Sequence, residues 1–265
     1  MAENKSTSTG DTGPVKQSMF PSEIIDLPSG GKTYPKDSPL SSGQLEMKYM
    51  TTKEEDILTS QNLIKKGLVV DVLLQSLILT PGVKVEDMLL GDKNGILVAA
   101  RILAYGPEYP CEIQDPTTGE KMTHTFNLSD CGFKELPKDV DYSENKFEYE
   151  TIIQKKKIEF KFLTGKEERA VDKDLKGLKK LGQERELSTR YKHMILSVDG
   201  DDKKSTINMF CENMLARDSI EFRTYLDKIQ PDIILSQEVD MGGELVPVDI
   251  PLGLDFFWPK ARTQR

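Results

Sequence analysis

The strongest constraint on the fold of this chain is a pattern that occurs twice in the same order. Met50-Thr51-Thr52-Lys53-Glu54-Glu55 is echoed by Leu163-Thr164-Gly165-Lys166-Glu167-Glu168. In the first copy, hydroxyl and acidic side chains stand where a helix N-terminus prefers them, so we expect a helix to begin there. A repeated signal of this kind predicts a repeated supersecondary unit around it.

Further matches follow in order. Ile195-Leu196-Ser197 corresponds to Ile78-Leu79-Thr80, residues 213–218 correspond to residues 87–92, and Pro231 corresponds to Pro107. Each series ends in a predicted hairpin, with turns at residues 115–119 and 240–244. The alternative explanation is that short charged strings recur by chance in a charged chain.

We therefore predict an α+β fold in two degenerate pseudo-repeats, each with small antiparallel strands or hairpins packed on helices. The halves span residues 20–138 and 146–259, with a linker at 139–145 and a tail at 260–265. Residues 1–19 have almost no apolar content, so we expect a flexible N-terminal arm.

Local patterns predict the individual elements. Residues 68–79 and 85–105 place apolar side chains at helical spacing, and residues 206–229 predict one or two further helices. Residues 20–26 are expected to be extended. Strands are predicted at residues 44–50, 109–113, 123–128, 147–153 and 157–163.

The charge of the 265-residue chain limits its partners. A net charge of −8 and a pI near 5.1 repel phosphate backbones and anionic lipid, so we expect no nucleic acid and no membrane as partner. No stretch approaches the roughly 18 uninterrupted apolar residues of a membrane span, and the first residues lack the apolar core of a signal peptide. The 3 cysteines form no disulfide framework and indicate reduced thiols in the cytosol.

Gly31-Lys32-Thr33 looks like the end of a phosphate-binding loop. That motif requires a further glycine where this chain has Asp26, whose negative charge would oppose a phosphate. The favoured interpretation is an ordered turn in which paired glycines allow positive φ and Tyr34 anchors the loop.

A zinc site is a second possibility that the residues support only in part. Cys111, His124 and Cys131 fall within one predicted hairpin and its exit, and thiolate and imidazole are preferred zinc ligands. No fourth ligand accompanies them, so ordinary buried thiols and a surface histidine are the favoured interpretation. We expect no metal and no cofactor.

Catalytic chemistry has little support. The chain has 2 histidines, and its 44 Asp and Glu residues show no spacing that singles out a pair. No Gly-x-Ser-x-Gly motif occurs. We predict a protein that is not an enzyme and has no catalytic residues.

The C-terminal region holds adjacent aromatic residues, Phe256-Phe257-Trp258, followed by Pro259. Such a cluster is costly to leave exposed. One hypothesis is that it closes the core of the second half under its hairpin. The other is that part of it anchors a partner protein, since Trp and Phe dominate interface hot spots.

Three motifs in this order resemble the baseplate hub assembly family of T-even-type contractile-tail phages. They are Leu27-Pro28-Ser29-Gly30-Gly31-Lys32-x-Tyr34, Arg101-Ile102-Leu103-Ala104-Tyr105-Gly106-Pro107-Glu108-Tyr109 and Leu254-x-Phe256-Phe257-Trp258-Pro259. The similarity extends from about Phe20 to Pro259. Some members of the family carry Cys-x-x-Cys pairs at the hairpin tips, where this chain has residues 115–119, and this departure weakens the zinc hypothesis further.

The resemblance implies a late phage protein that acts through protein–protein contacts. It would be either a subunit of the baseplate hub or a factor that helps the hub assemble, with other hub proteins and the tape-measure protein as partners. It would act in the host cytoplasm during assembly and then either remain in the virion or be an assembly chaperone absent from it. A hub-associated cell-wall hydrolase and a zinc-stapled adaptor are the other classes, and the oligomeric state stays open.

Overall fold

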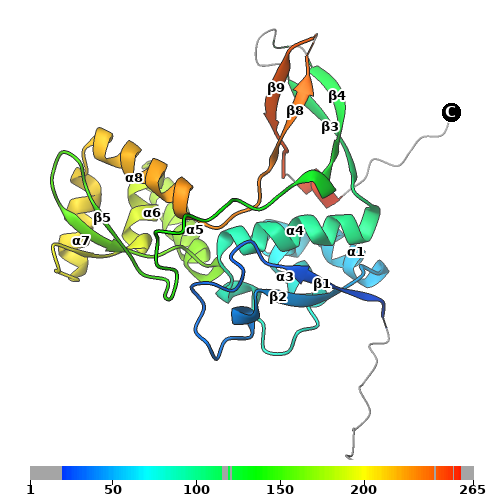
Figure 1. The fold of residues 1–265 in the computed structure, drawn as a ribbon, viewed down its shortest axis with the longest axis horizontal. Coiled ribbons are helices and arrows are strands. Elements are labelled where there is room, and N and C mark those ends of the chain that lie inside the picture. The colour runs from blue at the N-terminus through cyan, green and yellow to red at the C-terminus, as the bar shows by residue number, and fades with distance from the viewer. Residues whose placement is uncertain (1–19, 115–118, 120, 242, 253, 258–265) are drawn as a thin grey trace, which may run out of the picture.

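The computed structural model describes residues 20–257 apart from 115–118, 120, 242 and 253 (Figure 1). The predicted arm at 1–19 and tail at 260–265 lie outside the described residues, as do Trp258 and Pro259. The described chain contains helices and small antiparallel sheets, which confirms the predicted α+β class.

The first half runs from strands through helices to a hairpin. Its antiparallel pair, β1 (Ser22–Asp26) and β2 (Gln44–Lys48), is followed by α1 (Thr52–Thr59), α2 (Gln61–Lys66) and α3 (Val69–Leu77). The longer α4 (Leu90–Tyr105) leads into the hairpin of β3 (Glu108–Gln114) and β4 (Lys121–Asn127). The predicted helix start after Thr51 and the predicted hairpin are both confirmed.

The second half repeats this order with additions. The strand pair is β5 (Phe147–Glu150) and β6 (Lys157–Phe160), followed by α5 (Gly165–Lys180) and α6 (Glu186–Met194). A third strand, β7 (Ile195–Val198), joins β6, and α7 (Lys204–Asn213) and α8 (Ala216–Ile229) follow. The half ends in the hairpin of β8 (Ser236–Asp240) and β9 (Leu245–Asp249) and the short helix η4 (Leu254–Phe257).

The two halves share the same contacts at the start of their first helices. Thr51 and Glu54 form a capping box on α1, in which each satisfies a free backbone amide, and Lys48 donates to Glu54 at 2.8 Å. Thr164 and Glu167 form the same box on α5, and Lys161 donates to Glu167 at 2.6 Å. The repeated sequence pattern therefore corresponds to a repeated structural motif.

The later long helices also match. Asp92, the third residue of α4, accepts hydrogen bonds from Ser29 in the β1–β2 loop. Asp218, the third residue of α8, accepts hydrogen bonds from the backbone amides of Ile153 and Gln154 in the β5–β6 loop. Both carboxylates are 0% exposed. In each half a buried acid thus fixes the first loop to the start of the last helix.

The hairpins of the two halves lie side by side above α4 (Figure 1), and hydrogen bonds join them. Gln237 on β8 donates to the carbonyl of Asn127 at 2.6 Å, and the Ile234 amide donates to the carbonyl of Gly132 at 2.7 Å. The buried apolar residues of both halves form one continuous cluster. The halves therefore share a core.

The segment predicted as a linker is held on both sides. Tyr142 is buried, its carbonyl accepts from the Thr33 amide at 2.8 Å, and its hydroxyl donates to the carbonyl of Ile229 at 2.8 Å. It therefore ties the β1–β2 loop to the end of α8. The boundaries at 138 and 146 stay a prediction.

The capping box of α5 predicts an acid-sensitive contribution to stability. Burial acts to raise the pKa of Glu167, but hydrogen bonds from Lys161 and Thr164 outweigh it and lower the pKa from 4.5 to about 2. Because the folded pKa is depressed, this contribution is present above pH 4.5 and is lost as the pH falls towards 2. Urea unfolding across this pH range is expected to show a shallower pH dependence in Glu167→Gln, which still caps the helix, and an unchanged slope would contradict the assignment.

Gly91 offers a test of the packing between the halves. A Cβ at this position would overlap the Pro231 carbonyl oxygen and lie 2.7 Å from its carbonyl carbon. Gly91→Ala is expected to lower the free energy of unfolding by about 1–3 kcal/mol. The control is Gly177→Ala in α5, where nothing lies within 4 Å, and which should stabilise by about 0.5–1 kcal/mol. Equal effects of the two substitutions in urea unfolding would contradict this packing.

Candidate functional site

The sequence motifs singled out above lie far apart in the chain but meet on one helix, α4. The first contacts its N-terminal turn, the second forms its C-terminal end, and the third docks on that same end. The region of α4 where the three motifs meet is the candidate site.

The first motif binds the buried carboxylate of Asp92. The Ser29 amide and hydroxyl each donate to it at 2.8 Å, and the Tyr34 hydroxyl donates at 2.7 Å. Tyr34 also accepts from the Leu89 amide at 2.8 Å. Burial raises the pKa of Asp92 against these hydrogen bonds, and burial followed by the Asp92 charge raises the pKa of Tyr34. Tyr34 therefore connects the β1–β2 loop to the start of α4.

The glycines of this motif shape the loop. Gly30 and Gly31 have φ of 59° and 77°, and a Cβ on Gly31 would lie 2.6 Å from the Gly43 amide. Leu27 is buried, and Pro28 packs against Gly95 of α4. The Gly31-Lys32-Thr33 segment thus forms a tight turn against the protein's own backbone.

The second motif places a buried cation at the other end of α4. Arg101 is 1% exposed and donates to the carbonyls of Gly106 and Glu108 at 3.1 and 3.2 Å. Its guanidinium lies over the rings of Tyr105 and Tyr109, at 5.0 and 5.9 Å from their centroids. Burial lowers the pKa of Arg101. The side chain therefore fixes the turn between α4 and β3.

The third motif completes this arrangement from the opposite end of the chain. Arg101 Nε donates to the Phe256 carbonyl at 2.9 Å, and the Phe256 and Tyr109 rings meet edge to face at 5.0 Å. Phe256 and Phe257 are both buried. Phe256 therefore docks on the first half, and the hypothesis that the aromatic cluster closes the core of the second half under its hairpin stays a prediction.

The residues considered for zinc are only partly brought together. Cys111 and His124 are opposite each other in the β3–β4 pair, and the Cys131 thiol accepts from Gln237 at 3.8 Å. Burial raises the pKa of Cys131 and raises that of Cys211 to about 12. Within the described residues, no group of three or more His, Cys, Asp and Glu could hold a metal.

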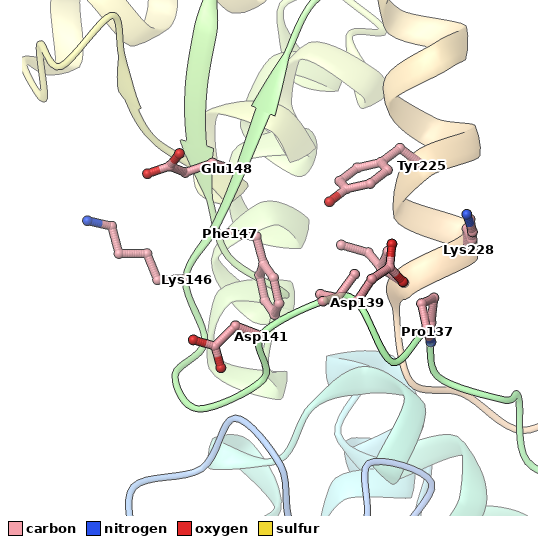
Figure 2. Close-up of a pocket in the computed structure, with 10 residues that line it drawn as sticks. Pro137, Asp139, Asp141, Lys146, Phe147, Glu148, Tyr225 and Lys228 are labelled. Atoms are coloured by element: carbon pink, nitrogen blue, oxygen red, sulfur yellow. The ribbon is translucent and has the colours of Figure 1, made fainter.

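A hollow of about 460 Å³ lies between the linker, β5 and the last turns of α8 (Figure 2). Asp139 and Tyr225 line it from the linker and from α8, and burial together with the Asp139 charge raises the pKa of Tyr225. Figure 2 shows the charged ends of Lys146 and Glu148 on one side of the hollow and that of Lys228 on the other side, on α8. These three charged groups therefore do not meet at one point.

Docking of the third motif can be tested by substitution. Phe256→Ala is expected to lower the free energy of unfolding by about 3–5 kcal/mol, because the ring is almost fully buried against Tyr109 and α4. Leu245→Ala on β9 is the control, since Leu245 is 63% exposed, and it should change stability by less than about 0.5 kcal/mol. A Phe256→Ala protein as stable as the control would show that the contact is not formed.

Comparison with known proteins identifies the family to which the chain belongs. A family described as T4 bacteriophage base plate protein matches residues 19–231, which include the first and second motifs but not the third. No curated protein and no solved structure matches the chain. The described helices include none that is both long and apolar enough to cross a membrane. The match spans most of the chain and includes two of the three motifs that converge on α4, so the chain belongs to the T4 bacteriophage base plate protein family.

Proposed function

We propose that this protein is a non-enzymatic component of the phage tail baseplate hub, or a factor in hub assembly, that acts through protein–protein contacts. The family match over residues 19–231 carries the proposal, because base plate proteins belong to the phage tail and interact with one another. The more specific assignment to the hub is supported by the resemblance of the three motifs to the baseplate hub assembly family.

The chemistry of the motifs supports a structural role. The carboxylate of Asp92 and the guanidinium of Arg101 are the most buried charges of the candidate site, and each binds groups of the protein itself. Groups engaged in this way position other segments and do not face a substrate. The motifs therefore maintain a shape on which contacts with other proteins can be built.

The surface offers apolar side chains for such contacts. Several exposed residues gather on the helices of the second half, where Met209 is 64% and Ile220 is 54% exposed. Apolar residues at the centre of a desolvated patch dominate the affinity of protein interfaces. We propose other hub proteins and the tape-measure protein as partners, met in the host cytoplasm during assembly.

Co-purification tests the proposal. The tagged protein would be recovered from cells that express the phage tail genes, and both the recovered proteins and finished particles would be identified by mass spectrometry. We expect hub and tape-measure proteins in the recovered material. Presence in particles would identify a structural subunit, and the same partners without the particle signal would identify a chaperone absent from the virion.

Two outcomes would contradict the proposal. One is recovery without any tail protein, tested with Gly91→Ala as a destabilised control and Gly177→Ala as a folded control. The other is lysis of peptidoglycan by the purified protein that a single Asp or Glu substitution abolishes, which would favour the hydrolase class.

A further inference from the structure

The two halves contact each other through a short antiparallel bridge. Leu89, just before α4, pairs with Thr164, just before α5. The Leu90 amide donates to the Leu163 carbonyl at 3.3 Å, and the Gly165 amide donates to the Met88 carbonyl at 3.0 Å. An extended segment of the second half, with the helix that follows it, is thus seated beside the start of α4.

This contact uses a different surface on each half. The first half contributes the segment before its last helix, and the second half contributes the segment before its first helix. In a head-to-tail contact of this kind, each half uses one of two surfaces. The first half keeps an unused segment before its first helix, and the second half keeps an unused segment before its last helix. By the correspondence between the halves, the unused surfaces are the Met50–Thr52 segment before α1 and the Met214–Ala216 segment before α8.

The unused surface of the second half is a groove. It lies between α6, the end of α7 and the start of α8, has a volume of about 500 Å³, and is lined by Leu187, Cys211, Met214, Ala216 and Ile220. Leu187 is 45% exposed and Ile220 is 54% exposed. In the first half, the corresponding region beside α3 and α4 is where the start of α5 lies.

The backbone groups of the two unused surfaces are complementary. Met214 carbonyl and Ala216 amide correspond to Met88 carbonyl and Leu90 amide, and no hydrogen bond to either is found within the described residues. The same holds in that part of the chain for the Met50 carbonyl and the Thr52 amide, which correspond to those of Leu163 and Gly165. Each unused segment therefore presents one backbone amide and one backbone carbonyl, as the Leu89 and Thr164 segments do in the bridge between the halves.

We propose that a second copy of this chain docks head to tail, with its Met50–Thr52 segment bridging to Met214 and Ala216 and the start of its α1 in the groove. The Ala216 amide would donate to the partner copy's Met50 carbonyl, and the Thr52 amide of that copy would donate to Met214. Repeating the contact builds either a closed ring or a filament. This inference goes beyond the hub proposal and does not depend on it.

Two sequence differences make this contact weaker than the internal one. A Cβ on Gly165 would lie 3.0 Å from the Val85 carbonyl oxygen, and Thr52 replaces this glycine in the first half. Arg169 forms ion pairs with Glu86 and Asp71, and Asp56 stands at its corresponding position. The acid of the second half that corresponds to Glu86 is Glu212, which is already paired with Lys192 and Arg185. The association is therefore reversible and depends on concentration.

Sedimentation velocity over a range of concentrations measures this association. Thr52→Pro removes the donating amide, and proline is tolerated at the first position of a helix after the extended Thr51, so the dissociation constant should rise about threefold to tenfold. Ile220→Glu should raise it by about tenfold or more. Leu245→Glu is the control, because Leu245 is 63% exposed on β9, in a hairpin that contributes to neither surface, and it should change nothing.

The double variant Thr52→Gly/Asp56→Arg restores the pattern of α5 and should tighten the association into discrete oligomers, which sedimentation velocity separates from the heterogeneous aggregates of a misfolded chain. Mixing Thr52→Pro with Ile220→Glu gives the sharpest test, since each variant keeps one intact surface. At a concentration where the mixture forms a 1:1 dimer, each variant alone should associate measurably less than the mixture. A wild type and double variant that stay monomeric throughout, or a mixture without dimer, would overturn the proposal.

Discussion

The carboxylate of Asp92 and the guanidinium of Arg101 sit at opposite ends of one helix, and both are buried with their hydrogen bonds made by other segments of the chain. A buried charge is tolerated only while its partners stay in place, because removing one leaves an uncompensated charge in a region of low dielectric. The β1–β2 loop, the β3 hairpin and η4 therefore have fixed positions relative to α4. The rest of the architecture is arranged around that helix.

Much of the fold could be predicted because its signals are local. The capping box at Thr51 predicted the start of α1, and Pro and Gly in the turns predicted the hairpins. The helix α5 was not predicted, although Thr164 and Glu167 repeat the same box, because its charged residues leave only Val171 and Gly165 buried. Hydrophobic periodicity is weak in such a helix, so the capping residues Thr164 and Glu167 were the available sequence signal for its start.

The sequence motifs named both residues of the Arg101–Phe256 contact but only one side of the contact with Asp92. The motifs named Ser29, Tyr34 and Arg101, but Asp92 is one of 44 acidic residues and no local pattern distinguishes it. Its position near a helix N-terminus and its match to Asp218 in the repeated segment were the available hints. The docking of Phe256 on the first half could not be predicted, since local propensity says nothing about which of two similar halves a distant segment contacts. Sequence repetition predicted the two halves, but the way in which they share a core depends on three-dimensional packing.

The contact of Phe256 with Arg101 and Tyr109 limits the order in which the nascent chain can fold. Arg101 and Tyr109 leave the ribosome long before Phe256, which supplies one carbonyl to Arg101 and one ring to Tyr109. Until Phe256 has been synthesised, the first half carries an incompletely paired buried cation and an uncovered apolar surface on its hairpin. The native arrangement is therefore completed only after Phe256 has left the ribosome, and a chain truncated before Phe256 exposes surface that favours aggregation.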